Sequence, residues 1–107
     1  MGSCRREVRH VKRSSIDQTH EMDLYEAILE LRDNEEARSF FNDLCTPAEL
    51  EGLIDRWRVA QMLVKNIPYR QIAAETKVST ATIVRVARFL NSGNDGYKTI
   101  MQRLGKI

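Results

Sequence analysis

The chain has 107 residues, of which 42% are hydrophobic and 30% are charged, and its formal net charge is +2. This length fits one small domain, and no stretch of 18 apolar residues could cross a membrane. The lack of such a stretch disfavours a membrane protein. The Cys and His residues also lack the spacing of a metal site, which disfavours a metal-centred protein.

The charges are distributed unevenly along the chain. Residues 1–20 hold five Lys and Arg against two acids, and residues 21–54 hold ten acids against two Arg. Residues 55–107 hold ten Lys and Arg against three acids. A basic C-terminal half suits a polyanionic partner, and the acidic middle would be directed away from it. This segregation favours a nucleic acid as the partner.

Residues 1–18 are polar and basic, without helical periodicity, and we expect a flexible arm. Its basic side chains could contact DNA phosphates, and a solvated tail is the open alternative. The arm lacks the apolar stretch that a secretory signal peptide needs, and Cys4 and Cys45 lie far apart in the sequence. We therefore expect a cytoplasmic protein with free thiols.

Residues 19–107 are expected to form one all-α domain that begins with two acidic helices. The first is predicted from about residue 20 to 32, with Asp17 or Thr19 as its cap. The second is predicted to begin at a cap formed by Asn34. Two adjacent Phe side chains near its end would pack against several elements, within one chain or in a partner chain.

The segment from Thr46 to Glu49 is the clearest local signal in the chain. Thr46 suits the N-cap of a helix, Pro47 suits the first helical position, and Glu49 completes a capping box. A long helix is predicted from here to about Lys65. It becomes apolar nearly all round towards its end, so we expect it to be a central strut packed on more than one side. Pro68 would open the next helix.

Residues 69–91 have the pattern of a helix-turn-helix. A short helix is predicted from Tyr69 to Thr76, and a second helix is predicted to follow Ser79 as its cap. Lys77 in the turn is unusual, because such turns commonly use Gly, which tolerates a positive φ. The inner face of the second helix is expected to consist of Ile83, Val86, Ala87 and Leu90.

The last part of the chain continues the helical pattern. Residues 91–96 are polar and rich in Asn and Gly, which indicates a loop. Apolar residues then recur at helical spacing from Tyr97 to about Leu104. We expect a short amphipathic helix that serves in packing or in a dimer.

The second helix of such a motif enters the major groove of DNA. Small side chains at its start can approach base edges with hydroxyl and methyl groups, and neighbouring arginines can reach phosphates or guanines. The predicted DNA-binding residues are Arg70, Gln71, Ser79, Thr80, Ala81, Thr82, Arg85 and Arg88.

Two alternatives to DNA binding are open from the residues alone. A helical protein-interaction module would use the basic half against an acidic protein surface. A small helical enzyme is disfavoured, because no paired acid and base or nucleophile recurs at a fixed spacing. We therefore expect a chain without catalytic residues.

Three motifs occur in order: Cys45-Thr46-Pro47-Ala48-Glu49-Leu50, Asp55-Arg56-Trp57-Arg58 and Ala81-Thr82-Ile83-Val84-Arg85. Over about residues 20–105 they resemble the Trp repressor family, and most of all its Trp-repressor-related branch of the YerC/YecD type. The resemblance implies an intertwined, all-helical homodimer that binds double-stranded DNA as a transcriptional repressor. Its two recognition helices would face successive major grooves about 34 Å apart.

The resemblance also implies a ligand pocket. In the family, two arginines sandwich an indole ring, and they match Arg56 and Arg85, while a pocket threonine matches Thr46. Val86 and Phe89 stand where the family has a Gly and a small polar residue, and overfilling such a site costs about 1–3 kcal/mol. We therefore expect no tryptophan cofactor, and either another small ligand or none.

Overall fold

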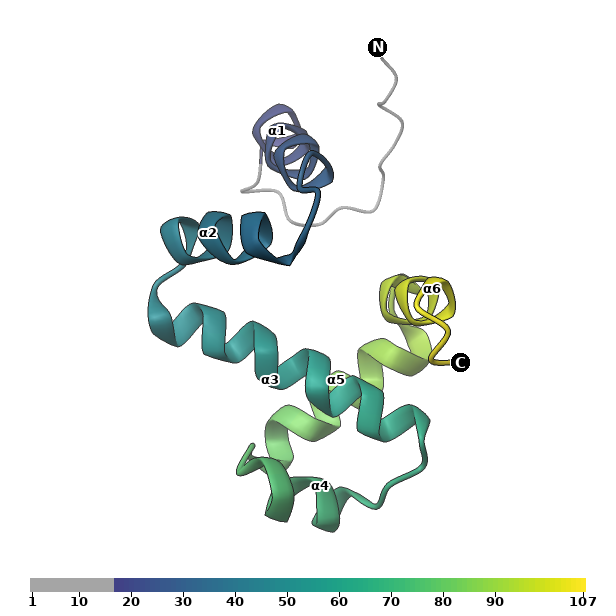
Figure 1. Ribbon diagram of the computed structural model, residues 1–107. Helices are drawn as coiled ribbons and strands as arrows, with labels where there is room; N and C mark the ends of the chain where they lie inside the picture. The colour runs from purple at the N-terminus through teal and green to yellow at the C-terminus, as the bar shows by residue number, and fades with distance from the viewer. Residues whose placement is uncertain (1–16) are drawn as a thin grey trace. The chain divides into compact units, whose positions relative to one another are not determined.

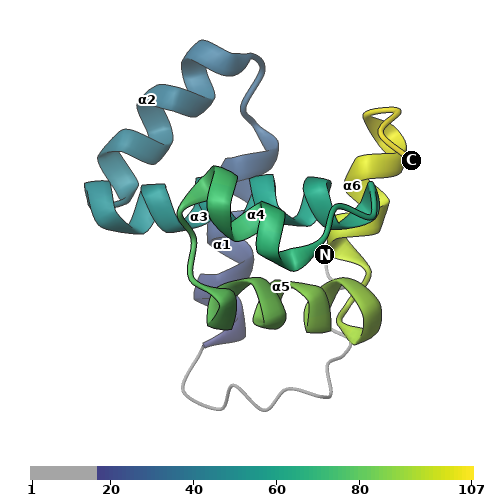
Figure 2. The ribbon, with the colours of Figure 1, turned by 90° about the horizontal axis from the view of Figure 1, so that it is seen from below.

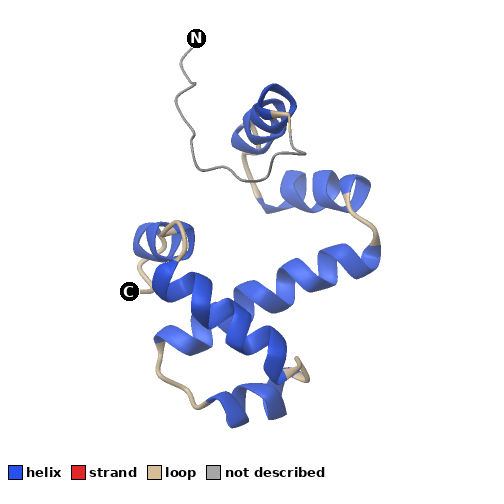
Figure 3. Cartoon of the chain, turned by 180° about the vertical axis from the view of Figure 1, so that it is seen from behind, coloured by secondary structure: helices blue, strands red, loops and turns tan. Residues whose placement is uncertain are grey.

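The computed structural model describes residues 17–107, so residues 1–16 of the predicted arm lie outside the described residues, while Gln18 begins the first helix. Over this range the chain is helical without strands, as the colouring of Figure 3 shows. No helix within it is long and apolar enough to span a membrane. The helices, labelled in Figure 1, are α1 (Gln18–Leu29), α2 (Asn34–Leu44), α3 (Pro47–Val64), α4 (Tyr69–Thr76), α5 (Thr80–Ser92) and α6 (Gly96–Arg103).

The chain divides into two compact units, with the boundary between Phe40 and Phe41. The described part of the N-terminal unit contains α1, whose first turn is capped by Asp17. The backbone N–H groups of Thr19 and His20 donate to Asp17 Oδ1 over 2.8 and 3.4 Å. These hydrogen bonds hold the pKa of the Asp17 carboxyl below its ordinary value of 3.8.

The cap of α2 differs from the prediction by one residue. Asp33, not Asn34, accepts the N–H of Glu36, over 2.9 Å, and Asn34 is already the first helical residue. The Glu36 side chain in turn accepts the N–H of Arg32 over 3.0 Å. Both residues are good caps, and the Glu three positions after Asp33 selects the earlier start. No residue of α1 or α2 is buried.

The predicted capping box of α3 is confirmed. Thr46 Oγ1 accepts the N–H of Glu49 over 3.1 Å, and Glu49 Oε1 accepts the N–H of Thr46 over 2.9 Å. The helix ends at Val64, and Asn66 just beyond it has a φ of 62°, a left-handed conformation that Asn tolerates better than most residues. Pro68 then stands at the N-cap of α4.

The core of the C-terminal unit forms around α3, which contacts α4, α5 and α6. In Figure 2, seen from below, α4 and α5 run beside α3, and each of the three helices contacts the other two. The rings of Trp57 on α3 and Tyr97 on α6 stack with their centroids 6.3 Å apart. The prediction that α3 is a central helix packed on more than one side is confirmed. The buried core of the C-terminal unit consists of Val59, Ala60, Ile72, Ile83, Val86 and Met101.

Candidate DNA-binding site

Two consecutive helices of the C-terminal unit, α4 and α5, lie where the helix-turn-helix was predicted, and they pack on each other. Ile72 on α4 and Ile83 on α5 are wholly buried, and Val78 between the helices packs against the same core. All four residues predicted for the inner face of α5 are buried. The opposite face of α5 is thereby turned outward by packing, not by the helix's own hydrogen bonds.

The turn places Lys77 in the left-handed region, with a φ of 65°. The Lys77 N–H donates to the carbonyl of Ala73 over 2.9 Å. Thr76 Oγ1 donates to the carbonyl of Ile72 over 2.7 Å and accepts the N–H of Val78 over 3.1 Å. A left-handed non-glycine residue costs about 1–2 kcal/mol, and the Thr76 hydroxyl offsets this by bonding backbone groups on both sides of the turn.

Ser79 caps α5, as predicted. Its Oγ accepts the N–H of Thr82 over 3.2 Å and donates to Thr82 Oγ1 over 3.1 Å. The two side chains therefore bond to each other across the first turn. Thr82 is half-buried, and its hydroxyl is already held by the cap, which limits its freedom to contact another molecule.

The other predicted DNA-binding side chains lie on the surface. Arg70 and Gln71 are exposed at the start of α4, where the Gln71 amide donates to Glu75 Oε2 over 2.8 Å. The exposed predicted residues on or beside α5 are Ser79, Thr80, Ala81, Arg85 and Arg88. The structure thus brings seven of the eight predicted side chains to the surface of one helix pair.

Val84 also belongs to this outer surface, and the residue pattern alone did not single it out. Its side chain is 48% exposed, whereas Val86 on the same helix is 1% exposed. Helical periodicity could have identified Val84 as exposed, because it lies outside the apolar stripe that begins with Ile83 and Val86.

The family resemblance assigned three residues to a ligand pocket, and all three, Thr46, Arg56 and Arg85, are exposed in this chain. The Thr46 hydroxyl is engaged in the cap of α3. The Arg56 guanidinium lies back along α3, with Nη1 3.4 Å from the place where a Cβ on Gly52 would stand. Val86 is part of the buried core, and Phe89 remains 46% exposed.

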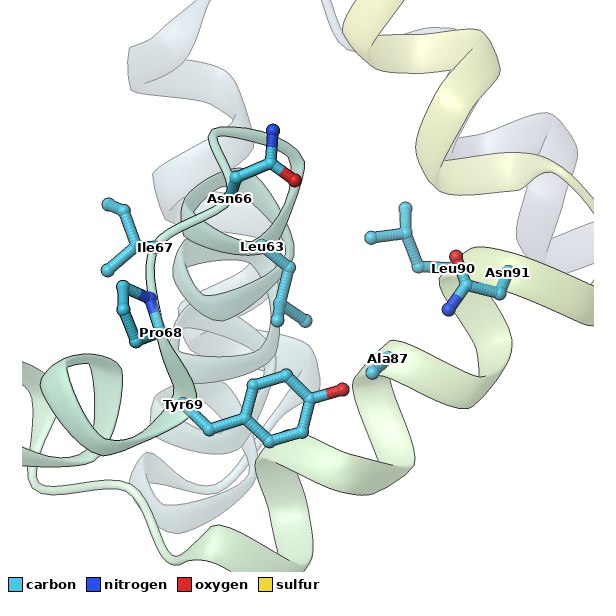
Figure 4. A pocket seen from close by; sticks show the side chains of 8 residues that line it. All are labelled: Leu63, Asn66, Ile67, Pro68, Tyr69, Ala87, Leu90 and Asn91. Carbon is cyan, nitrogen blue, oxygen red and sulfur yellow. The ribbon is translucent and has the colours of Figure 1, made fainter.

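A cavity of about 330 Å³ lies elsewhere in the C-terminal unit. Figure 4 shows it between the end of α3, the α3–α4 connection and α5, with Leu63, Tyr69 and Leu90 among its walls. None of the residues assigned to the ligand pocket lines it. Within residues 17–107 no group of three or more His, Cys, Asp or Glu side chains could hold a metal ion, and Cys45 is a free thiol.

The Trp repressor protein family matches residues 20–105, which include α1 from its third residue onward and the whole of α2 to α6. The chain belongs to the Trp repressor family. It is 48% identical over 81 residues to the uncharacterized protein YerC of Bacillus subtilis strain 168, covering 76% of this chain and 78% of that protein. The family membership agrees with the resemblance inferred from the three motifs.

Two solved structures are also similar. A TrpR-like protein from Eubacterium eligens ATCC 27750 has a TM-score of 0.78 at 49% identity, over 83% of this chain and 91% of that chain. A candidate Trp repressor from Staphylococcus aureus has a TM-score of 0.84 at 38% identity, over 91% and 97%. The fold is therefore that of a Trp repressor-like protein, in a family of DNA-binding regulators.

Proposed function

We propose that the chain is a sequence-specific transcriptional regulator, a cytoplasmic repressor without catalytic activity, that reads double-stranded DNA with α4 and α5. The observation that carries this proposal is the outward face of α5. Exposed Thr80 and Ala81 begin that face, and exposed Arg85 and Arg88 follow within the next two turns. Small side chains allow the helix to approach base edges, and arginines bind phosphates or guanines.

The charge distribution supports the same partner. Residues 55–107 hold ten Lys and Arg against three acids, and they include the whole of α4 and α5. The ten acids of residues 21–54 precede this region. A polyanion would be attracted to the basic unit, and the affinity should fall with added salt because phosphate contacts release counterions.

We also propose that two chains form an intertwined homodimer. Helix faces whose large apolar side chains are left exposed by one chain commonly mark an interface between proteins. In a dimer that reads a palindromic site, the two α5 helices would face successive major grooves about 34 Å apart. The large apolar side chains left exposed on α1, at the end of α2 and in the first half of α3 are Met22, Leu24, Tyr25, Leu29, Leu44, Leu53 and Ile54.

The DNA-reading assignment is tested by replacing Arg70 with Ala. Duplexes that bind the chain are first selected from a random pool, and fluorescence anisotropy then measures their affinity. Arg70→Ala should weaken binding to the selected duplex by roughly ten- to hundredfold, because a base or phosphate contact is lost. Circular dichroism should show an unchanged helical fold, because Arg70 is exposed.

Arg103→Ala is the matched control, since Arg103 is also an exposed arginine but lies at the end of α6. It should bind the selected duplex nearly as well as the parent chain. Equal affinities of the parent chain, Arg70→Ala and Arg103→Ala would mean that α4 is not part of the DNA interface. Failure of the parent chain to select any duplex would instead favour the protein-interaction module.

We further propose that the chain does not use tryptophan as a corepressor. Val86 fills part of the core where the family has a Gly, and it is 1% exposed, so an indole ring would have to displace packed atoms. Isothermal titration with L-tryptophan should give no heat of binding at ligand concentrations up to about 1 mM, where an affinity of about −4 kcal/mol would still be seen. Micromolar binding would contradict this proposal.

A further inference from the structure

The outward face of α5 carries one branched aliphatic side chain that the core does not use. Val84 is 48% exposed, while its neighbour Ile83 is wholly buried. Valine loses side-chain rotamer freedom in a helix, and here only part of its surface is removed from water. Helix stability therefore gives little reason for a valine at this position.

The neighbours of Val84 define a strip of exposed methyl groups. Val84 follows Thr80 by four residues and Ala81 by three, and residues at these spacings adjoin on a helix surface. Both neighbours are exposed. Arg88 follows Val84 by four residues, so the strip ends beside a guanidinium group that can bind a phosphate or a guanine.

One polar group beside this strip, the Thr82 hydroxyl, is already engaged within the chain. The Thr82 hydroxyl accepts from Ser79 Oγ over 3.1 Å, and the Thr82 N–H donates to the same oxygen over 3.2 Å. This ring of hydrogen bonds gives Thr82 a positioning role in the first turn of α5. Recognition in this turn would then depend more on apolar contacts by Thr80, Ala81 and Val84.

Among the four bases, thymine alone presents a methyl group in the major groove. We infer that Val84 packs against the 5-methyl group of a thymine in the bound DNA and thereby favours that base. This inference rests on the proposed function, because it requires α5 to lie in the major groove. Valine has no donor or acceptor in its side chain, so it cannot read the polar edges of the other bases.

The test is a scan in which uracil replaces each thymine of the selected duplex in turn, which removes one methyl group and keeps the base-pairing edge. The parent chain should lose about fourfold in affinity at one thymine of each half-site, and about fifteenfold when both are replaced. Val84→Ser should lose this sensitivity at that thymine and keep the parent's response at every other. Ser and Val have similar helix propensities, which makes the variant a matched one.

Val84→Ala serves as a second variant that adds no hydroxyl, and it should reduce the uracil effect at the same thymine. Circular dichroism verifies that each variant folds. Its affinity for the selected duplex with all thymines in place verifies that it binds DNA. If the parent and Val84→Ser respond alike to every uracil, or the parent responds to none, the inference is wrong while DNA binding stands. If the parent selects no duplex, the proposed function fails and this inference fails with it.

Discussion

Residues 41–107 bury a common core, whereas no side chain of α1 or α2 is buried in the described chain. In the C-terminal unit, α3 to α6 each supply at least one wholly or almost wholly buried apolar side chain. On α1, by contrast, Leu29 is 82% exposed and Met22 is 48% exposed. Both regions have apolar residues at helical spacing. They differ in whether other helices of the same chain bury those residues.

The same contrast occurs within α3. Ile54 in its first half is 56% exposed, and Val59 just over one turn later is fully buried. Val59 and Ala60, in the second half of the helix, belong to the buried core that α3 shares with α4, α5 and α6. A region with its own core can be stable in one chain, while uncovered apolar helices gain their burial only from a partner. Under the proposed function, the core of the C-terminal unit would stabilise the single chain, and the exposed apolar side chains of α1 would serve in assembly.

The largest effect is expected from a cavity in the C-terminal core. Ile72→Ala should lower the free energy of unfolding by about 2–5 kcal/mol, because Ile72 is wholly buried and its neighbours cannot refill the space. Urea denaturation followed by circular dichroism measures the change. The shift should be present at every protein concentration.

Ile107→Ala is the control with the same chemical change at a residue that is 53% exposed near the chain end. Its effect should stay within about 0.5 kcal/mol. Similar losses for both variants would mean that the core identified around α3 does not dominate the stability.

The next effect is expected from charging the exposed face of α1. Met22 and Leu29 lie seven residues apart on one face, with Tyr25 between them. The double variant Met22→Glu/Leu29→Glu should raise the dimer dissociation constant by at least about a hundredfold, since charged groups would replace apolar contacts. Sedimentation equilibrium measures the change.

Ile107→Glu introduces the same charge at an exposed apolar residue outside α1 and should leave the dissociation constant nearly unchanged. A double variant that still dimerises like the parent would show that this face of α1 is not the interface. A parent chain that is monomeric at all concentrations would refute the dimer itself.

The smallest effect concerns the cap of α1. The backbone N–H groups of Thr19 and His20 lower the pKa of Asp17, so the ionised cap stabilises α1 above pH 3.8 and this contribution is lost as the pH falls through the lower folded pKa. Carbon-detected NMR should give Asp17 a carboxyl pKa below 3.8. The Thr19 amide signal should change with pH as the Asp17 carboxyl titrates. Asp17→Asn keeps a capping side chain but has no carboxyl group, so it should remove this change. An unshifted pKa would contradict the cap.

Local chemistry determined much of this fold in advance. The capping box at Thr46, the limits of α4, the cap at Ser79 and the inner face of α5 all agree with the sequence-based predictions. Each depends on residues within about one or two turns of each other, so periodicity and hydrogen-bonding chemistry suffice. The start of α2 was missed by one residue because Asp33 and Asn34 are both good caps and the choice depends on Glu36.

Tertiary structure decided what the helix pair presents to the outside. Lys77 adopts a left-handed conformation that glycine would ordinarily take, within a turn tied by Thr76 and closed over the core by Val78. Val84 and Val86 are the same residue two positions apart on α5, yet one is 48% exposed and the other 1%. In an isolated helix both valines would be exposed to solvent. The packing of α5 against α3, α4 and α6 buries Val86 and leaves Val84 accessible to another molecule.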